Sequence, residues 1–207
     1  METNLFIFRL MNYWILTGGW VLYFVLHSAM AAEKVKHLAS RKGGRAYRYY
    51  RLFYSIFSTA GLVGLLILNG SIEADLFFKR EGIIRYLSLF FTTFGVMTIQ
   101  LAFRNYNLKS FLGFGEEKVE LRIVGISKYV RHPIYAGLIL ITTGFFLFIP
   151  NAPTLVTCLC IFSYLPIGIY LEEKKLIAIF GEKYIEYRKK VPSIFPRLPV
   201  HNQGLYF

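Results

Sequence analysis

Long apolar runs alternate with short polar stretches along this chain of 207 residues. Five runs stand out, at residues 13–32, 50–69, 83–103, 134–149 and 154–171. The first could extend backwards through residues 5–10. At 1.5 Å per residue, the first three runs are long enough to cross a hydrocarbon layer of about 30 Å. The pattern therefore predicts an all-α integral membrane protein with five transmembrane helices.

The last two runs are shorter, at 16 and 18 residues, and only the sequence Pro-Asn-Ala-Pro at residues 150–153 separates the helical segments. Proline and asparagine favour a turn, and this turn is too short to lead the chain far from the bilayer. We expect these two segments to form a C-terminal helical hairpin.

The polar pattern changes after the fifth run. Leu176, Phe180, Tyr184 and Tyr187 recur at helical spacing among lysines and glutamates. Such spacing predicts an amphipathic helix that lies at the membrane interface or folds back on the bundle.

Composition supports the membrane interpretation. The chain is 55% hydrophobic and only 17% charged, too few charges to cover a soluble domain of this size. The formal net charge is +12, but the basic residues flank apolar runs, which indicates contact with anionic lipids and not with nucleic acid. Cys158 and Cys160 lie two positions apart in an apolar run, so their side chains point to different faces and we expect no disulfide.

Lysine and arginine are distributed unevenly between the polar stretches. Residues 32–51, 104–131 and 174–197 hold seven, six and seven of them, which is 20 of the 24 in the chain. With five spans, these three stretches lie on one side of the membrane, which the positive-inside rule makes the cytoplasm. We therefore expect the N-terminus outside and the C-terminus inside, in a bacterial inner membrane or the endoplasmic reticulum of a eukaryote.

The first candidate for chemistry is Arg-His-Pro-Ile-Tyr-Ala-Gly at residues 131–137, at the cytoplasmic start of the fourth run. Pro133 suits the first position of a helix, where its missing N–H is harmless. The free N–H groups of that turn attract an anion such as a ligand carboxylate, and His132 and Tyr135 could face the same point. A basic flank with an interfacial aromatic residue explains the same letters without a ligand.

The second candidate is the pair Glu172 and Glu173, followed by Phe-Gly-x2-Tyr-x2-Tyr from Phe180. Two carboxylates at the end of a span are costly unless they are solvated or paired, and they point about 100° apart on a helix. A solvated pair beside Lys174 and Lys175 is the structural alternative. The hairpin brings this pair to the same level as His132, and a cationic corner beside a carboxylate suits a zwitterionic sulfonium cofactor.

Together the two motifs resemble the isoprenylcysteine carboxyl methyltransferases and phospholipid methyltransferases of membranes. The likeness covers about a third of the chain, from Gly125 to Pro196. It implies methyl transfer from S-adenosylmethionine to a lipophilic, membrane-soluble acceptor at the cytoplasmic face. It also implies two regions, an N-terminal three-helix region at 1–104 and a methyltransferase-like region at 105–207. The oligomeric state is left open.

The resemblance also implies the site residues. Cofactor-binding residues carried over from the family are Val119, Glu120, Leu121 and Arg122 in a strand-like piece, then Ser127, His132, Pro133, Ile134, Tyr135 and Glu172. Glu173 is the candidate catalytic residue, which would orient or deprotonate the acceptor. No metal-ligand cluster is present in the sequence.

Two positions depart from the family. Ser127 stands where the family usually has tyrosine, and Gly168 stands where isoprenylcysteine methyltransferases carry an arginine for the acceptor carboxylate. The second departure argues against an isoprenylcysteine acceptor and leaves lipid amines, small thiols or another lipophile open.

Two other functions remain open. Sterol reductases that use NADPH have a similar C-terminal layout, but their late motif differs from Phe-Gly-Glu-Lys-Tyr at residues 180–184. A non-enzymatic membrane scaffold or carrier would need charges along a path through the spans, and the centres of the spans carry none. His27, near the end of the first run, is interpreted as a structural or interfacial histidine, and Arg45, Arg48 and Arg51 as anchors to lipid headgroups.

Overall fold

A computed structural model describes residues 2–41, 43–104 and 121–196. Helices joined by turns and irregular segments make up these residues, with one isolated β-bridge between Leu76 and Asn151. The elements in chain order are α1 (Glu2–Ala31), α2 (Glu33–Arg41), α3 (Gly44–Ser71), α4 (Ile83–Phe103), the 3-10 turn η1 (Gly125–Lys128), α6 (Pro133–Phe148), α7 (Ala152–Phe180) and α8 (Glu182–Lys190). The all-α prediction is confirmed for these residues.

Four of the helices are long and apolar enough to cross a membrane. They are α1 from Leu10 onwards, α3 from Arg45, α4 and α7. The fourth predicted span corresponds to α6, which is apolar but only 16 residues long. A count of five spans therefore remains a prediction, whereas the described residues contain four candidate membrane-spanning helices.

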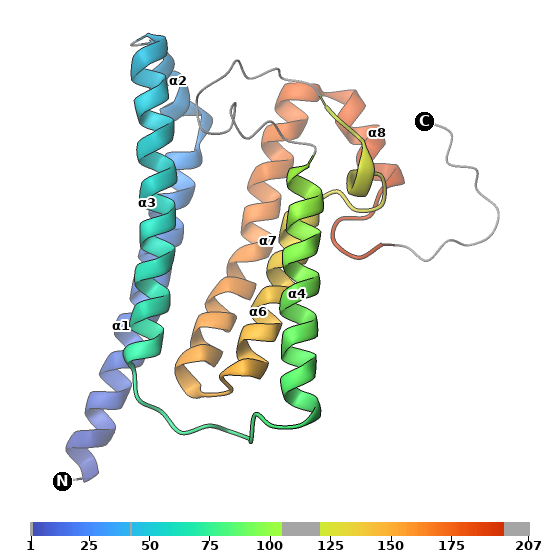
Figure 1. Cartoon of the computed structure of the whole chain (residues 1–207). Coiled ribbons are helices and arrows are strands. Elements are labelled where there is room, and N and C mark those ends of the chain that lie inside the picture. Colours follow the sequence, from blue (N-terminus) through green and yellow to red (C-terminus); the bar gives the residue numbers. More distant parts are fainter. Residues whose placement is uncertain (1, 42, 105–120, 197–207) are drawn as a thin grey trace.

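The helices are arranged in two groups that share α7 (Figure 1). Helices α1 and α3 lie side by side, and both contact α7. Helix α4 packs most extensively against α6, which in turn contacts α7 as the other arm of the hairpin. The division at residue 104 remains a prediction, although α4 makes its main contacts with a helix on the other side of that boundary.

Small residues let α4 and α6 approach closely. A Cβ atom placed on Gly95 would lie 2.7 Å from the carbonyl oxygen of Gly137, and one on Gly144 would lie 2.3 Å from Oγ1 of Thr92. The hydroxyl of Ser88 donates to the carbonyl oxygen of Gly144 at 3.0 Å. In a membrane, burying apolar side chains between helices gains little because the surrounding lipid is equally apolar. Helices there associate through close backbone contact of this kind. It fixes the position of α6, and with it the start of the helix, where His132 lies.

A neutral network of Trp20, Asn69, Thr154 and Thr157 joins α1, α3 and α7. Trp20 Nε1 donates to Thr157 Oγ1 at 3.1 Å, and Thr157 donates to Asn69 Oδ1 at 2.9 Å. Asn69 Nδ2 donates to Thr154 Oγ1 at 3.3 Å. All four side chains belong to residues that are at most 3% exposed. Because each polar group has a partner, the network holds three helices together without leaving an unpaired group in the core.

The turn between α6 and α7 has the predicted character. Asn151 caps α7 by accepting a hydrogen bond from the backbone N–H of Thr154 at 3.0 Å. Cys158 donates to the carbonyl oxygen of Thr142 at 3.5 Å, which links the two arms of the hairpin. Cys158 and Cys160 are both free thiols, as expected from their spacing.

The two ends of the bundle differ. Helix α2, η1, α8 and the segment at 191–196 gather at one end, and the segment at 72–82 lies at the other (Figure 1). At that second end, the backbone N–H of Phe77 donates to the carbonyl oxygen of Pro150 at 2.7 Å. This grouping agrees with the charge pattern, while the side of the membrane that each end faces remains a prediction.

The predicted amphipathic helix is divided between two elements. Leu176 and Phe180 belong to α7, which continues well beyond residue 171, while Tyr184 and Tyr187 belong to α8. The break falls at Gly181, whose φ of 58° lies in the left-handed region that glycine adopts readily. Periodicity predicted the buried face but not the change of direction within it.

Candidate functional site

His132 lies at the point where the chain enters α6. It is the residue that precedes Pro133, the first residue of the helix, and no side chain caps this end. Proline has no N–H, and the N–H groups of Ile134 and Tyr135 have no acceptor within the helix because they belong to its first turn. The start of α6 is thus a set of free donors beside an imidazole.

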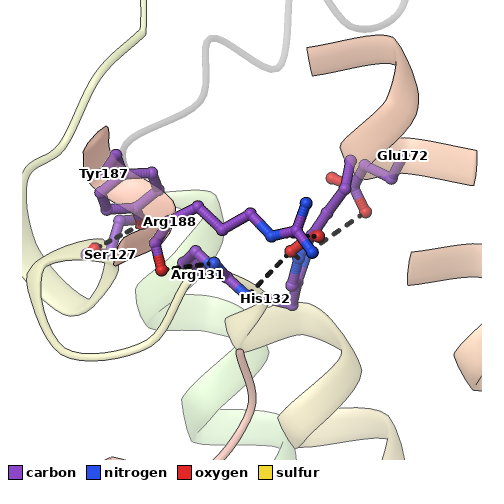
Figure 2. Close-up of polar contacts among 7 residues, drawn as sticks. Ser127, Arg131, His132, Glu172, Tyr187 and Arg188 are labelled. Carbon is purple, nitrogen blue, oxygen red and sulfur yellow. Dashed lines mark hydrogen bonds and ion pairs between the residues drawn. The ribbon is translucent and has the colours of Figure 1, made fainter. Parts of the chain in front are cut away.

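The imidazole of His132 lies between the two glutamates of α7 (Figure 2). Its Nε2 is 3.1 Å from Oε1 of Glu173, and its Nδ1 is 3.5 Å from Oε2 of Glu172. The side chain of Glu173 is 10% exposed, whereas that of Glu172 is 40% exposed. The glutamate that the sequence assigned to the cofactor is therefore the accessible one, and the other is buried.

Two arginines compensate the buried carboxylate of Glu173. Arg131 Nη2 lies 2.9 Å from Oε1, and Arg188 Nε lies 3.2 Å from Oε2. Arg131 also donates through Nη1 to the backbone carbonyl of Arg188 at 2.8 Å, which joins the start of α6 to α8. A buried charge is tolerated when it is paired and hydrogen-bonded, as here. We refer to Arg131, His132, Glu172, Glu173 and Arg188 as the charged cluster.

The segment that follows α8 fixes the backbone of the cluster. The N–H of Arg131 donates to the carbonyl of Pro192, and that of His132 donates to the carbonyl of Ser193, both at 2.9 Å. Tyr187 donates to the carbonyl of Ser127 at 2.6 Å, which attaches η1 to α8 (Figure 2). These bonds hold His132 in the non-helical conformation of a helix-capping residue.

The apolar contacts of α8 support this arrangement. Tyr184, Tyr187 and Val191 are buried together. The residues packed against them are Leu121, Ile123, Leu176, Ile177 and Phe180. Helix α8 is therefore held against α7 and the segment before η1 by its tyrosines, which positions Arg188 over Glu173.

Charge determines the protonation of His132. Burial alone would lower the pKa of this imidazole, but hydrogen bonding and attraction from Glu172, and then from Glu173, outweigh burial and raise its pKa above the ordinary value. His132 therefore keeps its proton to a higher pH than an isolated histidine does.

Two buried polar atoms beside the cluster have no hydrogen-bond partner among the described residues. They are Nε of Arg131 and the hydroxyl of Tyr184. Burial, and then the charge of Glu173, raise the pKa of Tyr184, so its hydroxyl keeps its proton and can donate. Unpaired buried donors are rare in folded proteins, and they commonly mark the position of a ligand.

Gly168 lies one helical turn before Glu172 on the same face of α7. A Cβ atom placed on Gly168 would lie 3.0 Å from the hydroxyl oxygen of Tyr135 and 3.1 Å from its Cε1. The carboxylate of Glu172 also lies near the Tyr135 side chain. Tyr135 thus occupies the space in front of Gly168 that a longer side chain at this position would need.

The structure brings most of the predicted site residues together. Those that gather at the ends of α6 and α7 are His132, Pro133, Ile134, Tyr135, Glu172 and Glu173. Ser127 lies on η1 and contributes its backbone carbonyl to Tyr187, not its side chain. Their roles in binding remain predictions.

The predicted strand-like piece falls partly outside the described residues. Val119 and Glu120 are among the residues that the structure does not describe. Leu121 and Arg122 form no strand, and Leu121 packs against the tyrosines of α8. The backbone hydrogen bonds to the segment after α8 come from Arg131 and His132 and not from the predicted strand-like piece.

Sequence reasoning did not assign roles to Arg188 or Tyr184. Both lie on one face of α8, four residues apart, and one faces the glutamate while the other is buried beside it. The sequence signal that could have indicated these roles is the four-residue spacing of Tyr184 and Arg188. Arg188 is also a basic residue in the helical segment that follows the two glutamates.

Comparison with known proteins supports a methyltransferase. Over 197 residues the chain is 27% identical to the methanethiol S-methyltransferase of Crocosphaera subtropica, covering 84% of this chain and 71% of that protein. It is 40% identical over 76 residues to the protein-S-isoprenylcysteine O-methyltransferase of Schizosaccharomyces pombe, covering 36% of this chain and 32% of that protein. A methanethiol S-methyltransferase of Bradyrhizobium diazoefficiens is also 40% identical over 76 residues, which cover 33% of this chain and 24% of that protein.

The chain thus spans only about a third or less of the second and third of these relatives. No solved structure matches the chain. The names of the relatives nevertheless support an enzyme that transfers methyl groups, and with the apolar helices they indicate a multi-pass membrane protein. The resemblance to the membrane methyltransferases is confirmed. Residues 15–198 match the NnrU protein family, so the chain belongs to that family.

Proposed function

We propose that this protein transfers a methyl group from S-adenosylmethionine to a small or lipophilic thiol at the cytoplasmic face of a membrane. The observation that carries the proposal is the meeting of the α6 start with Glu172 and Glu173 around His132. This arrangement joins free anion-binding donors, an accessible carboxylate and an imidazole whose pKa is raised by its two glutamate neighbours.

The residues present fit the methyl donor. S-adenosylmethionine carries a carboxylate, an ammonium group and a sulfonium. The free N–H groups at the start of α6 and the unpaired Nε of Arg131 suit its carboxylate. Glu172 is accessible and bears no arginine partner among the described residues, so it suits a cationic or hydroxyl group. When bound, the donor supplies an activated methyl group.

The protein residues then act mainly by positioning. Methyl transfer from a sulfonium is a direct displacement, and holding the two reactants in line supplies much of the acceleration. Tyr135 lies between Glu172 and Gly168, where an aromatic face can attract a sulfonium by a cation–π interaction. Glu173 is held by two arginines and His132, so we now assign it to orientation of the site and not to proton transfer.

Two observations favour a thiol as the acceptor. The relative that matches 84% of this chain bears a name that specifies methanethiol. In addition, Gly168 replaces the arginine that the isoprenylcysteine methyltransferases use for the acceptor carboxylate, and Tyr135 lies in front of it. An uncharged, membrane-soluble acceptor would reach the site sideways from the lipid, while the charged donor would enter from the cytoplasm.

The donor half of the proposal is tested by calorimetry on the protein in detergent, with S-adenosylmethionine and its demethylated product. Glu172→Gln keeps the size of the side chain and removes its charge. We expect it to weaken donor binding more than about ten-fold, since a charge-assisted hydrogen bond contributes about 1.5–3 kcal/mol. Glu182→Gln on the exposed face of α8 is the control and should bind normally. Unchanged affinity in a folded Glu172→Gln protein would contradict the assignment.

The acceptor half is tested by a methyl-transfer assay with methanethiol, a longer alkyl thiol, a farnesylcysteine analogue and phosphatidylethanolamine. We expect turnover of the two thiols and little of the other two. Robust turnover of the farnesylcysteine analogue alone would show that the enzyme does not need an arginine at position 168 and that a thiol is not its acceptor.

A further inference from the structure

A second polar cluster lies within the apolar helices, away from the charged cluster. His27 Nδ1 is 3.1 Å from Ser58 Oγ, and His27 Nε2 is 3.2 Å from the hydroxyl of Tyr54. Ser28 Oγ is 2.7 Å from the hydroxyl of Tyr164. We call these five residues of α1, α3 and α7 the histidine cluster.

The histidine cluster differs from the neutral network in the same three helices. The residues of the neutral network are at most 3% exposed, whereas every member of the histidine cluster is only half-buried. Hydrogen bonding between helices explains a sealed network completely. A half-buried histidine with tyrosine and serine hydroxyls has polar groups still available to a molecule that arrives from the lipid.

The face of α7 connects the histidine cluster to the charged cluster. Tyr164, Gly168 and Glu172 are spaced four residues apart, so they follow one another along a single face. The eight residues from Tyr164 to Glu172 correspond to about 12 Å along the helix axis. Tyr135 contacts this face at Gly168, one helical turn from Tyr164 in one direction and from Glu172 in the other. The donor and histidine sides of the site therefore meet at Tyr135 and Gly168.

The ring of His27 is suited to accept a proton. Its hydrogen-bond partners are the hydroxyls of Ser58 and Tyr54. The ring also packs in tilted orientation against Tyr23 and Tyr54, with centroid distances of 5.6 and 5.3 Å. No carboxylate among the described residues lies within ion-pair distance of the ring. A histidine with only hydroxyl partners has no neighbouring charge to stabilise its protonated form, in contrast to His132 between two glutamates.

We propose that the histidine cluster binds the thiol acceptor and that His27 accepts its proton. This inference rests on the proposed function. In the step, the thiol sulfur forms a bond to the methyl carbon of the donor, and the bond from that carbon to the sulfonium sulfur breaks. The thiol proton goes to the ring nitrogen of His27 that carries no hydrogen, in place of the hydroxyl that it faces in the resting site. The products are a methyl thioether, a neutral thioether on the former donor and an imidazolium. Tyr54 and Ser58 position the ring, and Tyr135, packed against Gly168, lies between the acceptor side and the donor side of the site.

The test compares two thiols of different acidity. His27→Gln should lower kcat/KM for an alkyl thiol about 100-fold, the usual scale for loss of a general base. The same variant should lower kcat/KM for thiophenol less than about threefold, because this aromatic thiol is largely ionised near neutral pH and needs no base. Tyr54→Phe should lower alkyl thiol turnover several-fold. His37→Gln, a histidine exposed on α2, is the matched control and should leave both rates unchanged.

Donor binding by calorimetry separates the possible outcomes. If donor binding is normal and both thiols show an equal defect, His27 has a structural role. If neither thiol shows a defect, His27 takes no part in the reaction. Either result overturns the inference but leaves the proposed methyl transfer intact. If His27→Gln fails to fold, Tyr54→Phe provides the same comparison, with a larger defect for the alkyl thiol expected. A wild-type protein that binds no donor and methylates neither thiol would instead contradict the proposed function.

Discussion

The neutral network and the charged cluster lie toward opposite ends of α7, and they differ in how their polar side chains are paired. The neutral network near the start of the helix consists of an indole, an amide and two hydroxyls, all buried and all paired. The charged cluster toward its other end contains three basic and two acidic side chains, and the carboxylate of Glu172 is partly exposed. Nε of Arg131 in this cluster and the hydroxyl of Tyr184 beside it are buried donors without a hydrogen-bond partner among the described residues.

The difference indicates what each group is for. A polar network that satisfies all its members stabilises one arrangement of helices and offers nothing to a ligand. A cluster with spare donors and an accessible charge is less stable alone than it would be with a ligand, which suits a binding site. Substitutions in the neutral network should therefore reduce stability without changing the affinity for the methyl donor. Substitutions in the charged cluster should reduce donor affinity, with or without a loss of stability.

The largest effect should follow the loss of Glu173. Glu173→Ala would leave Arg131 and Arg188 without their shared carboxylate, and breaking a buried ion pair from one side costs about 3–5 kcal/mol. We expect a lower unfolding temperature in detergent and more than a 100-fold loss of methyl transfer, since a misplaced reactant costs that much. The exposed pair of Glu182 and Lys189, 4.0 Å apart, provides the control: Glu182→Ala should change neither quantity measurably.

Asn69→Leu should have the next largest effect, confined to stability. It would leave the hydroxyls of Thr154 and Thr157 with one partner fewer, at a cost of about 1–3 kcal/mol for the buried groups. Thr59→Val, at an exposed position of α3, is the control for replacing a polar side chain. Unfolding temperature and donor affinity should be measured on the same protein. A loss of affinity at normal stability would contradict a purely structural role for the neutral network.

A smaller effect should depend on pH. The pKa of His132 is raised in the folded protein, so its contribution to stability is complete below its ordinary value of about 6.5 and is lost as the pH rises through the raised value. The unfolding temperature should therefore decline from about pH 6.5 upwards. His132→Gln should reduce that decline, and an identical pH profile in this variant would show that the charge of His132 contributes nothing.

Tyr184→Phe should have the smallest effect on stability. Its hydroxyl has no partner among the described residues, so its removal should be neutral or slightly stabilising. If the hydroxyl donates to the methyl donor, affinity should fall several-fold in the same protein. Tyr187→Phe, which removes the bond to Ser127, should instead lower stability.

Much of this architecture could be predicted from the sequence, because apolar runs report directly on helices in lipid. The runs near residues 50–69 and 83–103 correspond to α3 and α4, and the hairpin falls at residues 149–151. The motif residues His132 and Glu172 could also be placed together, since a hairpin returns the chain to the level that it left. These inferences needed only segment length and direction.

The remaining features depend on contacts that local patterns do not contain. Adjacent glutamates look equivalent in the sequence, and only the approach of Arg131 and Arg188 determines that Glu173 is the buried one. Likewise, nothing near Arg131 indicates that its backbone pairs with Pro192. The pairing of α4 with α6 through Gly95 and Gly137 is also invisible to periodicity, which reports where apolar residues lie but not which helix they meet.

The hydrogen bonds from Arg131 and His132 to Pro192 and Ser193 have a consequence for biosynthesis. The cluster cannot be completed until about 60 further residues have been translated after His132, which takes roughly 3–12 s at the usual rates. Helices α4 and α6 can associate earlier, because their close contact requires no later segment. The newly made protein should therefore pass through a stage with its helices inserted and its charged residues still in water, unable to bind the donor until the last helix has been released and docked.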